Sequence, residues 1–291
     1  MPAEPNRRIV ASLLLVSRAG AVVVGGFGAF VLMGWGLSLA VVKSVVPGLA
    51  TTKVNTVLGF MLAGVALWLL RGGKSAASGS ARLRIAQGCA LAVCLLGLLT
   101  LAEYTLGLDL GIDEFLFRDP TWAADTTAPG RMSPHSAFNF LVIGLALLLL
   151  DRKAGARSAQ WLANVALAIS FVALIGYAYS VVSLYRIASY TGMALHTAAA
   201  FLVLSVGVLC ARPEQGLMAI FVADSAGGVL ARRLIVLSMV VPPVLGILRL
   251  EGERAGFYGR EFGTALFAVA NVAVFSEIGR ASCRERVYVL V

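Results

Sequence analysis

The sequence predicts an all-α integral membrane protein, a bundle of about eight transmembrane helices with its N-terminus in the cytoplasm. Of the 291 residues, 59% are hydrophobic and 13% are charged, whereas a soluble globular domain contains about 25% charged residues. The mean hydropathy is +0.88. Long apolar runs alternate with short segments that hold most of the basic residues, as in multi-pass membrane proteins. This composition excludes a soluble domain, a disordered chain, a disulfide scaffold and a nucleic-acid-binding domain.

Seven apolar runs meet or approach the roughly 20 residues that a helix needs to cross a bilayer. They cover residues 19–39, 54–70, 85–105, 134–150, 161–183, 193–211 and 234–250. Residues 9–16 are expected to form an interfacial helix or an extension of the first run. Ser133 and Pro134 are typical of an N-cap and a first-turn proline. Pro242 and Pro243 are expected to kink or interrupt the seventh run, and an eighth begins near Thr264.

Orientation follows from the charges between the runs. With the N-terminus inside, the cytoplasmic segments hold more Lys and Arg than the outside segments, where acidic residues dilute the basic ones. The largest outside loop covers about residues 106–132. Residues 72–80 have the composition of a flexible cytoplasmic linker.

Three segments of the sequence resemble one another. They are NTVLGFMLAGVALWLLR from Asn55, HSAFNFLVIGLALLLLD from His135 and HTAAAFLVLSVGVLCAR from His196. Each has Asn or His first, Ser or Thr second and Phe sixth, and GTALFAVANVAVF from Gly263 keeps part of this pattern. These are the second, fourth, sixth and eighth spans, so the bundle is predicted to consist of four parallel helical-hairpin repeats.

The repeat places polar side chains at one depth, near the outer surface. The candidate ligand pocket consists of Asn55, Glu103, His135, Asn139, Tyr177 and His196. Ionisable groups within a span are costly and usually face a bundle interior or a cavity, which favours a pocket. A structural layer of hydrogen-bonded histidine and glutamate is the alternative. A metal or haem site would need His135 and His196 to face each other, which their spacing does not establish. No catalytic residue, metal ligand or cofactor is assigned.

The chain is expected to divide at residue 276. Residues 1–276 form the membrane domain, whose last apolar run ends at Phe275 and is too short to complete a span. Residues 278–287, IGRASCRERV, resemble the translation of a common sequencing adapter. Residues 277–291 are therefore interpreted as a non-native tail, and the natural protein is expected to continue beyond the eighth span.

Three stretches carry a resemblance to a known class of protein: GRMSPHSAFNFLVIGLALLLLD, SLYRIASYTGMALHTAAAFLVLSVGVLCARPEQG and RLEGERAGFYGREFGTALF. Over roughly residues 10–276 the chain resembles the multipass N-terminal sensor region of bacterial sensor histidine kinases and some diguanylate cyclases. The resemblance implies a bacterial inner-membrane location, a homodimer, and cytoplasmic PAS, kinase or cyclase domains after the membrane region. It implies no particular ligand.

These observations favour a membrane-embedded sensory module, which would relay an outer-leaflet or periplasmic stimulus to a cytoplasmic output domain that the sequence does not contain. A small-molecule membrane transporter is the alternative, since a duplicated hairpin and a kinked span suit one. A membrane enzyme would depend on Glu103, His135 and His196 alone. The expected partners are the lipid bilayer and an unidentified small ligand or membrane stimulus, with no nucleic acid.

Overall fold

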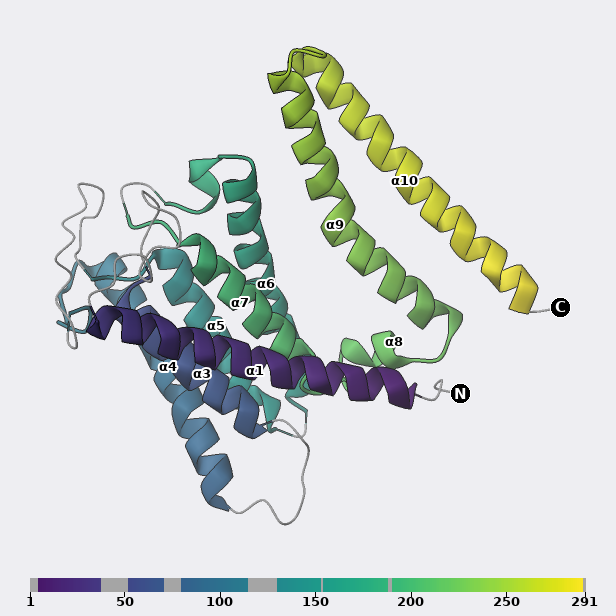
Figure 1. Cartoon of the computed structure of the whole chain (residues 1–291). Coiled ribbons are helices and arrows are strands. Elements are labelled where there is room, and N and C mark those ends of the chain that lie inside the picture. The colour runs from purple at the N-terminus through teal and green to yellow at the C-terminus, as the bar shows by residue number, and fades with distance from the viewer. Residues whose placement is uncertain are drawn as a thin grey trace. The chain divides into compact units, whose positions relative to one another are not determined.

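The structure is a computed structural model that describes residues 5–37, 52–70, 80–114, 130–152, 154–187 and 190–289 (Figure 1). In these ranges every regular element is a helix, apart from one isolated bridge between Pro5 and Ala223. The helices are α1 (Arg7–Gly36), α3 (Val54–Leu70), α4 (Ser80–Leu106), α5 (Pro134–Leu150), α6 (Ala156–Ala178), η1 (Val182–Leu184), α7 (Leu195–Leu209), α8 (Met218–Val222), α9 (Ala226–Arg254) and α10 (Arg260–Val289). The prediction of an all-helical chain is confirmed for the described residues.

Eight of these helices correspond to the eight predicted apolar runs. Five are long and apolar enough to cross a membrane, within Arg7–Gly36, Ala81–Leu106, Ala156–Ala178, Gly227–Arg254 and Arg260–Arg280. Helices α3, α5 and α7 have 17, 17 and 15 residues. At 1.5 Å per residue they span about 22–26 Å, less than the roughly 30 Å hydrocarbon core.

Several boundaries differ from the predicted runs. Residues 9–16 belong to α1, so they extend the first run. Helix α6 ends at Ala178, because Ser180 adopts a φ of 57° and the Val181 amide donates to the Gly176 carbonyl at 2.7 Å, a helix-ending turn. Helix α9 continues through Pro242 and Pro243 without interruption.

Further predicted features differ from the structure or lie partly outside the described residues. The short helix α8 was not predicted. Helix α10 begins before Thr264 and passes through Glu277, so it is longer than the apolar run inside it. Of the predicted linker 72–80, only residue 80 is described, and the loop 106–132 is described only at its two ends.

The chain divides into two units, one containing Arg7–Met218 and the other containing residues 1–6 and 219–291. We refer to Arg7–Met218 as the six-helix unit. In it, α1, α3, α4, α5, α6 and α7 pack in that order around a ring that closes between α7 and α1, and α3, α5 and α7 also contact one another. The three short helices are therefore central and the three long helices peripheral.

The central helices meet through one repeating pattern of positions. Counted from Asn55, His135 and His196, the second, sixth, ninth and thirteenth residues of each helix are at most 2% exposed. This 4-3-4 spacing is that of a coiled-coil seam. At the sixth position Phe60, Phe140 and Phe201 form an aromatic triad, with ring centroids 5.1 Å, 4.6 Å and 4.6 Å apart.

The peripheral helices present small residues to this centre. On α6 the buried stripe is Ala159, Ala163, Ala166, Ser170, Ala173 and Gly176. On α4, a Cβ at Gly97 would lie 2.4 Å from the Ala137 carbonyl oxygen, so α4 and α5 are in backbone contact. Small residues allow this approach between helices in lipid. The opposite face of α4 exposes Leu91 and Leu98, at 49% and 47%, as a lipid-facing surface does.

The second unit is built on the α9–α10 hairpin, whose helices pack against each other. Tyr258 closes the turn between them by donating its hydroxyl to the Arg249 carbonyl at 3.2 Å. Its ring occupies the space beside Gly252 and Gly263, where any Cβ would clash with it. Only 6% of the apolar stretch in each of α9 and α10 is buried, so the hairpin surface is apolar and almost wholly exposed.

Candidate functional site

One end of the six-helix unit collects most of its buried polar contacts, and we call it the polar end. Helices α3, α5 and α7 begin there, while α1, α4 and α6 end there. Three aromatic hydrogen bonds tie these ends together. Trp35 donates to the Thr52 carbonyl at 3.1 Å, Tyr104 to Met132 at 2.7 Å and Tyr177 to Met193 at 2.6 Å. In each case the acceptor lies three residues before Asn55, His135 or His196.

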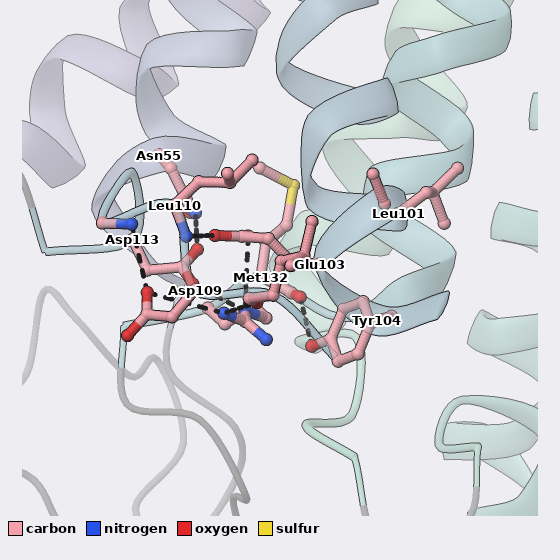
Figure 2. A network of polar contacts seen from close by, with 12 residues as sticks. Asn55, Leu101, Glu103, Tyr104, Asp109, Leu110, Asp113 and Met132 are labelled. Atoms are coloured by element: carbon pink, nitrogen blue, oxygen red, sulfur yellow. Dashed lines mark hydrogen bonds and ion pairs between the residues drawn. The ribbon is translucent and has the colours of Figure 1, made fainter. Parts of the chain in front are cut away.

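A buried group of charges lies at the polar end, and we call Glu103, Arg131, Asp113 and Asn55 the charge cluster (Figure 2). The Arg131 Nε donates to Asp113 Oδ2 at 2.6 Å and lies 3.4 Å from Glu103 Oε2. The Asn55 side-chain amide donates to Asp113 Oδ1 at 3.1 Å. The cluster therefore joins the first turn of α3, the last turn of α4, the segment before α5 and the loop after α4.

The loop after α4 folds back over Glu103. The Leu110 amide donates to Glu103 Oε1 at 2.9 Å (Figure 2). Gly130, whose φ is +70°, packs against this segment, since a Cβ there would lie 2.8 Å from the Asp113 carbonyl oxygen. Both the backbone conformation and the lack of space require glycine at this position.

The cluster is shielded from solvent and its formal charges do not balance. Glu103, Asp113 and Arg131 are 1%, 7% and 9% exposed. With both carboxylates ionised, the two acids and the one guanidinium carry a net formal charge of −1. Among the described residues Glu103 Oε2 accepts no hydrogen bond. Burial raises the pKa of Asp113 to about 6, opposed by the hydrogen bond from Arg131 and reinforced by the negative charge of Glu103.

The six predicted pocket residues are only partly brought together. Asn55 and Glu103 belong to the charge cluster, linked through Asp113 and Arg131. The other four make separate contacts, and in the described part of the chain no hydrogen bond, ion pair or ring contact joins any two of the six directly.

Three of these four residues contact side chains outside the predicted set. Asn139 donates to Ser170 Oγ at 3.0 Å. His196 is hydrogen-bonded to the Thr52 hydroxyl, and its ring meets Phe27 at 5.7 Å. Tyr177 stacks on Tyr185 at 4.0 Å.

His135 differs from these because its Nδ1 is buried without a hydrogen-bond partner among the described residues. The same residues contain no group of three or more His, Cys, Asp or Glu placed to hold a metal ion.

Sequence reasoning missed Asp113 and Arg131, which it treated as loop charges. A signal was present, since a glutamate at the end of a span needs a cationic or hydrogen-bonding partner. The sequence offers Arg118 and Arg131 in the adjoining loop, and nothing in the spacing distinguishes them. The N-cap assignment is confirmed, because Ser133 accepts from the Ser136 amide with Pro134 in the first turn of α5.

The end of the six-helix unit opposite the polar end is held mainly by backbone capping. Gln160, fully buried, donates to the carbonyls of Arg212 and Gln215 and accepts from the Leu217 amide at 2.6 Å. Arg212 donates to the Leu70 carbonyl at 2.8 Å, where a cation is favourable because it meets the last carbonyls of α3. These contacts are structural.

Long apolar helices with exposed apolar faces define the chain as an α-helical, multi-pass membrane protein. Comparisons with protein families, with curated proteins and with solved structures find no match to it.

Proposed function

We propose that the chain is the membrane-embedded sensory module of a bacterial signalling protein, whose parent carries a histidine kinase or diguanylate cyclase output domain. The charge cluster carries this proposal. It ties a loop to three helices through charged groups that are buried, so a change in its ligands or protonation would alter how α3, α4 and α5 pack. A stimulus acts on a protein only by favouring one such state over another.

The proposed architecture has eight spans arranged as four parallel hairpins. The support is that the same hydrogen bond recurs at Trp35, Tyr104 and Tyr177. Each time, an aromatic residue near the end of one helix binds the carbonyl three residues before the repeat segment of the next. The aromatic triad adds to this support, since Phe60, Phe140 and Phe201 occupy the same repeat position. The α9–α10 hairpin is the proposed fourth unit.

The proposed orientation places the N-terminus in the cytoplasm of a bacterial inner membrane and the polar end outside. The distribution of Lys and Arg between the spans supports it. In this orientation the Asp109–Asp113 segment faces the periplasm, and Arg82 and Arg212 lie on the cytoplasmic side. The loop that covers the charge cluster then lies on the periplasmic side.

A transporter is less well supported than a sensor. The aromatic triad fills the centre of the six-helix unit with three rings that are 0% exposed. A polar substrate that crossed between the central helices would have to displace all three rings.

The sensory proposal is tested at the gene. Genomic DNA read across residues 276–291 and beyond is expected to encode the end of the eighth span, followed by a PAS, kinase or cyclase domain. A stop codon directly after the span, or genomic DNA encoding the same final residues, would contradict it. If an output domain is present, Glu103→Gln is expected to change its activity, whereas Glu261→Gln, in the exposed first turn of α10, leaves it unchanged.

A further inference from the structure

We infer that the charge cluster is a proton-binding site, in which Asp113 takes up one proton and the loop over Glu103 responds. The inference names external acidity as the stimulus of the sensory module, and this part of it rests on the proposed function. The proton binding itself is a property of the described residues.

The geometry places two carboxylates on one guanidinium. Arg131 Nε lies 2.6 Å from Asp113 Oδ2 and 3.4 Å from Glu103 Oε2. One guanidinium nitrogen thus faces both acids, and Glu103 Oε2 is left without a hydrogen bond among the described residues. Like charges at such a site disfavour the state in which both acids are ionised. One added proton changes the formal charge of the cluster from −1 to 0.

The interactions of Asp113 with described residues involve the following groups. Arg131 and Glu103 face it directly, and Asp109, 86% exposed at its side chain and 4.0 Å from Arg131, adds a screened negative charge. Asn55 binds the other carboxylate oxygen as a neutral donor. Tyr104 lies beneath Arg131, with the guanidinium 5.4 Å from its ring centroid.

Two further charges lie on the same segments. Lys53, 5% exposed, precedes α3, and Glu114 follows Asp113. Both have interactions of their own.

Linkage fixes the direction of the response. With the loop closed, the pKa of Asp113 is about 6, above the 3.8 of a free aspartate. An acid whose pKa is raised in one state stabilises that state when it is protonated. Acidification therefore favours the closed loop, and the stabilisation is lost as the pH rises through about 6. Between about pH 7.5 and pH 5 the opening equilibrium of the loop falls about tenfold.

The test uses the full chain in lipid nanodiscs, with aspartate labelled with 13C at its side-chain carboxyl. Infrared difference spectra are expected to resolve one aspartate carboxyl that titrates near pH 6, about two units above a free aspartate. Asp113→Asn removes this band, and the matched variant Asp109→Asn retains it. The wild-type titration alone decides the case if Asp113→Asn fails to fold.

Hydrogen exchange of residues 107–114, corrected for the pH dependence of the chemistry, reports the loop. Wild type and Asp109→Asn are expected to become about tenfold more protected between about pH 7.5 and pH 5, and Asp113→Asn shows no change. An aspartate band with no component near pH 6, or equal pH dependence in both variants, overturns the proton site and leaves the sensory proposal standing. Genomic DNA without an output domain refutes the sensory proposal and leaves the titration unaffected.

Discussion

Phe140 provides a direct test of the aromatic triad. It is 0% exposed, whereas Phe138, two residues earlier on α5, is 39% exposed. Phe140→Ala removes one ring that contacts two others, at 5.1 Å and 4.6 Å. Phe138→Ala removes a ring from the opposite side of the same helix. The two variants therefore change composition equally and differ in what surrounds the lost ring.

The expected loss follows from the cavity rather than from hydrophobic transfer. Separated helices of an unfolded membrane protein stay in lipid, so burying a ring gains little by removing it from water. A cavity on the order of 100 Å³ at about 24 cal/mol per Å³ costs about 2 kcal/mol. The two aromatic contacts add about 0.5–1 kcal/mol each, so Phe140→Ala is expected to lower the free energy of unfolding by about 3–4 kcal/mol. At Phe138 lipid chains fill the space, and the loss stays within about 0.5 kcal/mol.

The measurement is reversible unfolding by sodium dodecyl sulfate in mixed micelles, followed by tryptophan fluorescence. Equal losses in the two variants, or a loss below about 1 kcal/mol for Phe140→Ala, would refute a packed triad at the centre of the six-helix unit. Phe140→Leu restores part of the volume and is expected to recover part of the stability.

Three further changes have definite outcomes. Gly97→Ala is expected to weaken the packing of α4 on α5, because its Cβ would lie 2.4 Å from the Ala137 carbonyl oxygen. The control Gly88→Ala lies on the same helix with open space around it. It is expected to leave the free energy of unfolding, measured by thermal unfolding in nanodiscs, unchanged or to raise it by up to about 1 kcal/mol. Gln160→Leu removes the side chain that binds the carbonyls of Arg212 and Gln215 and the amide of Leu217. The free energy of unfolding in the same assay is expected to fall by about 1–3 kcal/mol. A variant as stable as wild type would disprove the capping role. Arg131→Met leaves the buried carboxylates of Asp113 and Glu103 without their guanidinium, so a loss of about 3–5 kcal/mol is expected near pH 7.5. The loss is expected to be smaller near pH 5, below the pKa of about 6 at Asp113, and an equal loss at both pH values would contradict this.

The helices could be predicted from hydropathy because each apolar run is bounded by charges or by turn residues. Ser133 and Pro134 fixed the start of α5 to the residue. The end of α6 could not be predicted, because the turn at Ser180 depends on a left-handed backbone conformation that serine seldom adopts. Hydropathy also does not distinguish central from peripheral helices, because both kinds are apolar. They differ in the placement of small residues, which a mean hydropathy does not reveal.

The charge cluster was half visible in the sequence. Glu103 and Asn55 were identified because each stands at the end of an apolar run. Asp113 and Arg131 lie near the two ends of the 106–132 loop, and no local pattern pairs them. Their contact brings Gly130 so close to the Asp113 carbonyl that a Cβ would not fit there. Tertiary structure alone supplies that information.

The contacting rings of Phe60, Phe140 and Phe201 have a consequence for proton leakage across the membrane. The three fully buried rings fill the space between the central helices, so no continuous chain of water molecules forms along the axis of the six-helix unit. A proton bound at the proposed Asp113 site would therefore be released on the side from which it came. Many copies of such a protein could then lie in one membrane without making that membrane permeable to protons.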